Sequence, residues 1–279
     1  MNQLVSTSWL NDNLDKVKIL DASWHLPNVK RDSFQEFKKN HISNSFFFDI
    51  DKNSNQKTSL PHMLPSKEDW QIIVSNLGIK NSDHIIVYDN SDVFSSCRVW
   101  YTFIYFGHDP NLISVLDGNF EKWLVEKRPV TQKVSSVIKS NYIANENVSL
   151  VINKDQVNQN INDKKFQLID ARGEKRFKGL EPEPRKELRS GNIEGSINLP
   201  FKELINEDSL PLSIFEKCEK RKENQFFELF FKYVVEGVSP YRKNKQIIVE
   251  DVDEDSDEDV DEDVDEDVID VEFFENLLV

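Results

Sequence analysis

Short apolar runs alternate with segments of helical spacing through the first 130 positions of the chain. Uninterrupted apolar runs are typical of strands that are buried on both faces of a parallel sheet, whereas apolar residues at a three- to four-residue period indicate helices. The pattern predicts strands at Val17–Ser23, His84–Asp89 and Leu112–Gly118, and helices at Lys67–Ile79, Ser95–Gly107 and Asn119–Val130. This alternation indicates an α/β fold in which a parallel sheet carries helices on both faces.

A similar pattern begins again about 150 residues later. The run Phe166–Arg172 echoes Val17–Ser23, and Gly191–Phe201 echoes Asn40–Ile50, in the same order and at nearly the same spacing. The segment Thr131–Leu150 is polar, lacks strong periodicity and joins the two copies. The sequence therefore predicts an internal duplication, with two copies of one α/β unit.

The second copy is expected to be incomplete, because the sequence after Asn206 no longer resembles the corresponding part of the first copy. Beyond it lies a low-complexity acidic repeat, which is expected to be disordered because its carboxylates repel one another and little apolar surface can be buried. The predicted units are residues 1–135 as an N-terminal domain, 136–150 as a linker, 151–206 as the start of a C-terminal domain, 207–249 as a divergent segment and 250–279 as an acidic tail.

The net charge of −15 belongs to that tail rather than to the folded part. Residues 250–272 hold 16 acids and no base, so the remainder sits near −15 + 16 = +1. Neither part has the basic surface expected of a nucleic-acid-binding protein. A basic partner for the acidic tail is an alternative to a purely solubilising role.

The remaining composition points to a reducing, cytoplasmic compartment. No run of 18 apolar residues exists, so no membrane span is expected. The first 20 residues lack a basic segment followed by an apolar one, so no secretory signal is expected. The two cysteines, Cys97 and Cys218, lie in unrelated contexts, which suggests neither a disulfide framework nor a metal site.

An ordered set of short motifs makes a resemblance specific. The motifs are DASWHLP (Asp21–Pro27), FFFDID (Phe46–Asp51), LPHMLPS (Leu60–Ser66), VYDN (Val87–Asn90), RVWYTF (Arg98–Phe103), FGHD (Phe106–Asp109), VLDGNFEKWL (Val115–Leu124) and the long stretch Asp170–Phe201. Together they resemble the 3-mercaptopyruvate/thiosulfate sulfurtransferase family, which has tandem rhodanese-like domains, over residues 4 to about 205. His41–Ser45 departs from the Pro and Gly that the family tends to have at that turn.

The resemblance implies sulfur transfer without a cofactor. A thiol acid, 3-mercaptopyruvate or thiosulfate, gives its sulfur to an enzyme cysteine as a persulfide, and a thiol such as a reduced dithiol, or cyanide, then removes it. The motif context implies that Arg176 and Arg185 bind the substrate anion, since a guanidinium fits a carboxylate with two parallel hydrogen bonds. The alternative is a solvated loop in which they pair with neighbouring glutamates. The stretch EPEPRK and the DASWHLP motif favour mercaptopyruvate.

The resemblance also implies a supporting acid and imidazole from the first domain, at Asp51 and His62. These two groups would move a proton where thiol and substrate meet. The alternative reading is a loop aspartate and a histidine in a proline-bounded turn. Either way, their chemistry requires a nucleophile.

The nucleophile is the missing part. The family's thiol sits in a Gly/Ser-rich loop of the type CGSGVT, which lets backbone N–H groups surround the thiolate, and no such loop occurs here. Asp89 stands at the corresponding position of the first copy, and the repeat offset places the second position near residue 240. There a retained strand would lead into a loop that starts at Glu236; the alternative is that everything after about Asn206 is unrelated sequence. Cys218 lies in a charged, glycine-free, helix-favouring stretch, and Cys97 is expected to be a small core residue.

Three functions therefore remain open from the sequence. The first is a sulfurtransferase; the second is a catalytically inactive rhodanese-like module that binds an anion or a partner; the third is an interaction protein acting through its acidic tail. We expect residues 1–135 to be well folded and the second copy to be marginally stable, because an incomplete parallel sheet leaves an exposed edge.

Overall fold

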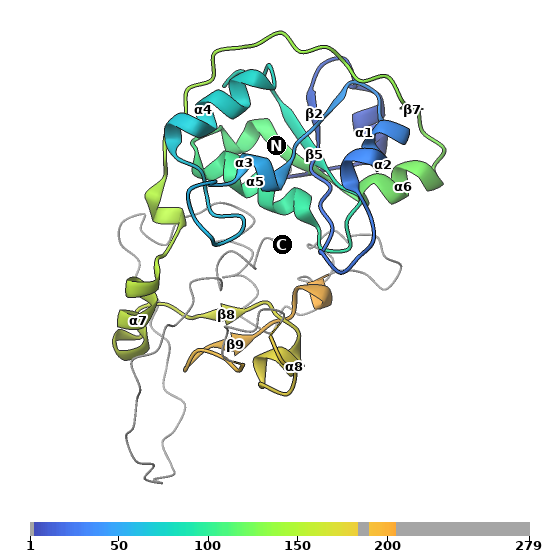
Figure 1. The fold of residues 1–279 in the computed structure, drawn as a ribbon. Coiled ribbons are helices and arrows are strands. Elements are labelled where there is room, and N and C mark those ends of the chain that lie inside the picture. Colours follow the sequence, from blue (N-terminus) through green and yellow to red (C-terminus); the bar gives the residue numbers. More distant parts are fainter. Residues whose placement is uncertain (1–2, 184–189, 205–279) are drawn as a thin grey trace, which may run out of the picture.

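A computed structural model of the chain describes residues 3–183 and 190–204. Its first half is built on a parallel sheet of five strands in the order β1-β6-β5-β2-β4. The strands are β1 (Leu4–Val5), β2 (Lys18–Asp21), β4 (Ser45–Phe47), β5 (Ile85–Tyr88) and β6 (Ile113–Leu116). The predicted α/β fold with a parallel sheet is therefore confirmed for this half (Figure 1).

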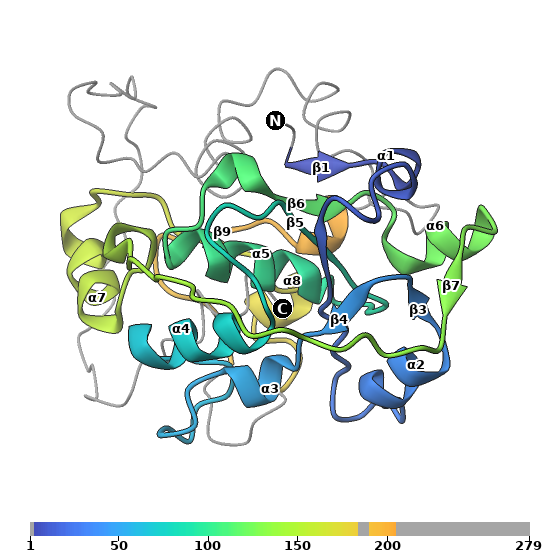
Figure 2. The same cartoon turned by 90° about the horizontal axis from the view of Figure 1, so that it is seen from above.

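Helices cover both faces of this sheet (Figures 1 and 2). They are α1 (Thr7–Asn11), α2 (Ser33–Lys39), α3 (Ile50–Asn53), α4 (Lys67–Asn76), α5 (Ser95–Tyr105) and α6 (Asn119–Val125), with a 3₁₀ turn η1 at Pro110–Leu112. A short antiparallel pair, β3 (His41–Ile42) with β7 (Val130–Thr131), lies outside the main sheet.

Alternation along the central strands divides the core into two layers. Ile85 and Val87 face a cluster that contains Trp70 of α4 and Phe103 of α5. Ile86 and Tyr88, next to them in the chain, face a second cluster with Leu10 of α1 and Trp123 of α6. A strand that is buried on both sides must be apolar throughout, which explains the uninterrupted runs in the sequence.

The segment expected to be a linker is docked on the first half as an extended strap, residues 132–147. Its backbone N–H groups bond to Ser75 O from Ser140 (2.9 Å), to Phe106 O from Asn145 (2.8 Å) and to Tyr105 O from Asn147 (2.7 Å). Tyr142 is fully buried in the core between these points. The strap therefore completes the core of the first half.

The second half begins after η2 (Val148–Leu150) with α7 (Lys154–Asp163). It continues through β8 (Ile169–Asp170), α8 (Glu174–Phe177), β9 (Ile197–Asn198) and η3 (Phe201–Leu204). Strand β8 pairs in parallel with β9, as β2 pairs with β4 in the first half. Strand β8 is shorter than the apolar run Phe166–Arg172 suggested, since only Ile169 and Asp170 pair with β9.

Several expectations fall outside the described residues. These are the interpretations of Arg185, Cys218 and Glu236, of the divergent segment 207–249 and of the acidic tail 250–279. Within residues 3–183 and 190–204, no helix has the length and apolar character that a bilayer crossing requires.

Candidate functional site

Asp51 and His62 lie within hydrogen-bonding distance, although 11 residues separate them in the sequence. Asp51 sits in the first turn of α3, whose N-terminus is capped by the Asp49 side chain accepting from Lys52 N at 3.1 Å. The Nε2 atom of His62 lies 2.8 Å from Oδ1 of Asp51. The Asp51 side chain is 66% exposed and that of His62 only 9%, so the pair presents a carboxylate to solvent and holds the imidazole beneath it.

Trp24 completes this pair from the loop after β2. Its indole N–H donates to both Asp51 oxygens, at 3.2 Å to Oδ1 and 3.1 Å to Oδ2. The same ring meets the His62 imidazole edge-on, with centroids 4.8 Å apart and planes at 90°. The hydrogen bond from His62, aided by the one from Trp24, holds the pKa of Asp51 below its usual range, so the carboxylate is ionised.

The backbone of His62 is also fixed. His62 has a φ of 56°, in the left-handed region that non-glycine residues rarely adopt. A guanidinium N–H of Arg98, from α5, donates to the His62 carbonyl oxygen. Arg98 is buried and lines a small pocket behind His62 with Thr102 and Trp70. This anchor keeps the imidazole turned toward Asp51.

Arg176, the described member of the expected arginine pair, is held by a glutamate. It lies on α8, and its Nε is 3.1 Å from Oε2 of Glu183, to which its Nη2 also donates. Arg172, two residues after β8, donates to the other Glu183 oxygen at 2.8 Å and to the Asp170 carboxylate at 2.6 Å. One of the glutamate pairings that the sequence left open is thus present, while substrate binding by Arg176 and Arg185 stays a prediction.

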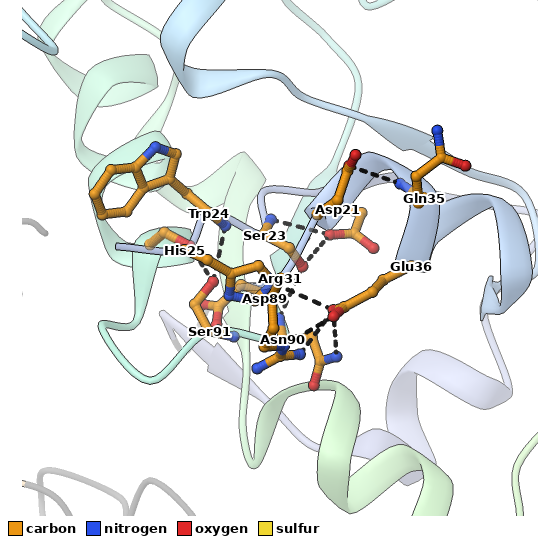
Figure 3. Close-up of polar contacts among 12 residues, drawn as sticks. Asp21, Ser23, Trp24, His25, Arg31, Gln35, Glu36, Asp89, Asn90 and Ser91 are labelled. Atoms are coloured by element: carbon orange, nitrogen blue, oxygen red, sulfur yellow. Dashed lines mark hydrogen bonds and ion pairs between the residues drawn. The ribbon is translucent and has the colours of Figure 1, made fainter. Parts of the chain in front are cut away.

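Asp89, which the sequence places at the first-half counterpart of the expected thiol, is a buried carboxylate (Figure 3). It accepts from the backbone N–H groups of Ser91 and Ser96, each at 2.8 Å, and from the Asn119 side chain at 3.2 Å. Ser96 lies in the first turn of α5, where unpaired N–H groups favour an anion. Burial raises the pKa of Asp89, and the hydrogen bonds from Ser96 and Ser91 offset only part of this effect.

Cys97 does not have the properties of a nucleophile. Burial raises the pKa of its thiol to about 12, and the nearby Asp89 carboxylate adds to the shift. At neutral pH such a thiol is protonated and unreactive. Cys97 lies on α5 with intermediate exposure rather than in either core cluster, so its expected place in the core stays a prediction, while the raised pKa argues against a nucleophilic role.

The site also contains residues that the sequence reasoning did not assign. Trp24 and Arg98 were quoted within motifs, but their contacts with Asp51 and His62 were not foreseen. The glutamate that bridges Arg172 and Arg176 was considered only as one of several partners. In the described ranges, no group of three His, Cys, Asp or Glu side chains could hold a metal ion.

Sequence comparison finds one matching protein family and several similar proteins of known name. The family described as a rhodanese-like domain matches residues 6–126. The 3-mercaptopyruvate sulfurtransferase of Rattus norvegicus is 36% identical over 218 residues, which cover 75% of this chain and 73% of that protein. The mitochondrial thiosulfate/3-mercaptopyruvate sulfurtransferase 1 of Arabidopsis thaliana is 38% identical over 249 residues, 81% of this chain and 65% of that protein.

A solved structure extends the similarity to three dimensions. The crystal structure of SseA from Escherichia coli, a 3-mercaptopyruvate sulfotransferase of the rhodanese fold, superposes with a TM-score of 0.68 at 30% identity. The match covers 78% of this chain and 84% of that one.

Proposed function

This chain belongs to the 3-mercaptopyruvate/thiosulfate sulfurtransferase family, and from that membership we propose that it binds a small thiol acid beside Asp51 and His62. The observation that carries the proposal is the 2.8 Å contact between these two side chains. An ionised carboxylate paired with a largely buried imidazole is suited to accepting and returning a proton.

The anion of the ligand would be bound by Arg176 and Arg185. Arg176 already makes a two-nitrogen contact with the carboxylate of Glu183, so its guanidinium is oriented for an acid. A ligand carboxylate would take over part of this contact. We also propose that β8 and β9 open a second rhodanese-like unit, which makes the architecture tandem.

The reaction proposed for the family's chemistry is a two-step transfer. The carbon–sulfur bond of 3-mercaptopyruvate breaks, its sulfur joins an enzyme thiolate as a persulfide, and the carbon takes up a proton to leave pyruvate. A dithiol acceptor then removes the outer sulfur as sulfide and becomes a disulfide. His62 and Asp51 would carry the proton. The thiolate would have to come from Cys218, because the Cys97 thiol has a pKa of about 12.

The test is sulfide release by the purified chain, given 3-mercaptopyruvate and a dithiol. Release that disappears in Cys218→Ser and persists in Cys97→Ser would support transfer through Cys218. Release at the level of buffer alone would refute catalysis by this chain.

A second function is favoured by a specific observation, namely the closed carboxylate cradle at Asp89 together with the lack of a CGSGVT-type loop in the sequence. In this alternative the chain is a catalytically inactive module that binds a thiol acid or another small anion. Calorimetric titration with pyruvate, which has the same carboxylate and no sulfur, separates the two: heat of binding without sulfide release supports the module, whereas no heat together with no sulfide release refutes both.

Partners and compartment follow as further proposals. A reduced dithiol as sulfur acceptor and a reducing, cytoplasmic compartment fit a protein with two cysteines and no evident pairing. A basic partner of residues 250–272 would be lost when these residues are deleted, and its binding would weaken with salt.

A further inference from the structure

The indole N–H of Trp24 is shared between the two oxygens of Asp51, and this is the one bifurcated hydrogen bond to that carboxylate among the described residues. His62 reaches a single oxygen of Asp51, whereas the Trp24 N–H lies at 3.2 and 3.1 Å from the two. Because the Asp51 side chain is 66% exposed, packing alone leaves its carboxyl plane free to turn. The indole N–H therefore sets the rotation of the carboxylate and keeps Oδ1 aimed at His62.

Trp24 is itself held at its backbone. Its N–H donates to Oγ of Ser91 at 2.8 Å, and the Ser91 hydroxyl also bonds to Oγ of Ser95 at 2.8 Å. The Ser91 N–H in turn donates to Asp89 at 2.8 Å. Figure 3 shows the Trp24 backbone joined to Ser91 while the indole points away from this network.

These contacts form a continuous path from the first half's buried carboxylate to the proposed site. It runs from Asp89 through Ser91 and Trp24 to Asp51 and ends at His62. Every link is a hydrogen bond of 3.2 Å or less. Ser91 and Ser95 are both buried, so the hydrogen bonds that hold the Trp24 backbone are shielded from water, which would otherwise compete for them.

We infer that Trp24 is a positioning residue for the Asp51–His62 pair and that Ser91 is its anchor. The inference rests on the proposed function, in which this pair moves a proton. The loop after β5 carries no thiol in this half. Its role here is structural, because Ser91 fixes the Trp24 backbone and Trp24 in turn orients Asp51 toward His62.

The test compares Trp24→Phe with the wild-type full chain. Phenylalanine keeps an aromatic ring at this position and removes the indole N–H together with part of the ring, so Ser91→Ala is needed as the variant that leaves the indole whole. The readout is the pH titration of the Asp51 carboxyl carbon by NMR, and the titratable groups that face this carboxylate are His62 and Lys52. We expect the Asp51 pKa to move up toward its ordinary value in Trp24→Phe. An Asp51 titration equal to the wild type would overturn the inference.

Two further variants make the result decisive. Trp9→Phe removes an indole from a partly exposed site beside His84, away from Asp51, and is expected to titrate as the wild type. Ser91→Ala removes the backbone anchor and leaves the indole in place, so it tests the path even if Trp24→Phe does not fold. It should shift Asp51 in the same direction, and an unshifted Asp51 would exclude the anchor.

The Asp51 titration does not depend on turnover, so the positioning role of Trp24 can be tested separately from the proposed sulfurtransferase activity. If the wild type releases no sulfide, catalysis fails while the Asp51 titration still decides the role of Trp24. If it does release sulfide, Trp24→Phe should lower kcat about tenfold and leave KM within about twofold, because proton transfer is weakened and anion binding is not. A change confined to KM would contradict the inference.

Discussion

Asp21 and Asp170 accept the same backbone hydrogen bond, each from the N–H two residues further on, at 3.0 Å from Ser23 and 2.9 Å from Arg172. Each aspartate ends a strand that pairs in parallel with the next edge strand, β2 with β4 and β8 with β9. The side chains that donate to these two carboxylates differ. Ser23 adds a hydroxyl at 2.5 Å to Asp21, whereas Arg172 adds a guanidinium at 2.6 Å to Asp170.

This difference predicts that Asp21→Asn stabilises the first half above pH 6. Burial without a cation raises the pKa of Asp21 from its ordinary 3.8 to about 6. A carboxyl with a raised folded-state pKa gives stability that is fully present below pH 4 and is lost as the pH rises through 6. Removing the charge should restore roughly 2–3 kcal/mol at pH 7.5 and much less at pH 4.

Urea unfolding followed by tryptophan fluorescence measures this effect, because all five tryptophans lie in the first 123 residues. Asp170→Asn is the matched control: it weakens the ion pair with Arg172 in the second half and should leave the fluorescence transition where it is. An Asp21→Asn variant that is less stable than the wild type at pH 7.5 would show that the Ser23 bonds outweigh burial.

Gly78→Ala should destabilise the first half by about 1–3 kcal/mol. Gly78 has a φ of 69°, and a Cβ there would lie 2.7 Å from the carbonyl oxygen of Ile138 in the strap. Thermal unfolding followed by circular dichroism measures the loss. Gly173→Ala, where a Cβ would meet nothing within 4 Å, is the control and should be nearly neutral. Equal midpoints would show that the strap does not lie against Gly78.

The sequence predicted the central elements because their signals are local. Ile85 to Tyr88 is apolar throughout, and α4 and α5 carry helical spacing. Strand β1 was missed because it has only two residues and gains its place by pairing with β6, more than 100 residues away. The strap was read as a linker because its hydrogen bonds go to backbone carbonyls of other elements, which leaves no periodicity in its own residues.

The site was predictable only where a motif marked it. Asp51 and His62 came from the family resemblance, since neither residue stands out in a hydrophobic pattern. Their link through Trp24 depends on a loop after β2 and a helix after β4 meeting in space. No spacing along the chain encodes that distance.

Cys97 should react with iodoacetamide at least about a hundredfold more slowly than a free thiol at pH 8. Its pKa of about 12 leaves little thiolate at that pH. The experiment uses Cys218→Ser, so that Cys97 is the one cysteine present. The same variant in urea should react at an ordinary rate. Rapid alkylation of the folded variant would contradict the raised pKa and reopen Cys97, which is partly exposed, as a nucleophile.

Glu183→Gln should bind a small carboxylate more tightly than the wild type does. The Glu183 side chain is only 2% exposed and accepts hydrogen bonds from Arg176, the residue that we propose binds the ligand carboxylate. The Arg176 side chain of this ion pair is 28% exposed, so we expect the pair to contribute up to about 1 kcal/mol, and removing the Glu183 charge should raise pyruvate affinity by up to about fivefold. Glutamine keeps an oxygen for Arg172 and limits the structural damage.

Calorimetric titration with pyruvate at low salt measures this change, and Arg176→Ala is the opposing variant. If Arg176 binds the anion, its removal abolishes the gain, so the double variant binds no better than Arg176→Ala alone. If Arg176 serves only to hold Glu183, the single variants Glu183→Gln and Arg176→Ala should leave pyruvate affinity unchanged and lower stability instead. Pyruvate affinity therefore changes if Arg176 binds the anion, whereas only stability changes if Arg176 serves to hold Glu183.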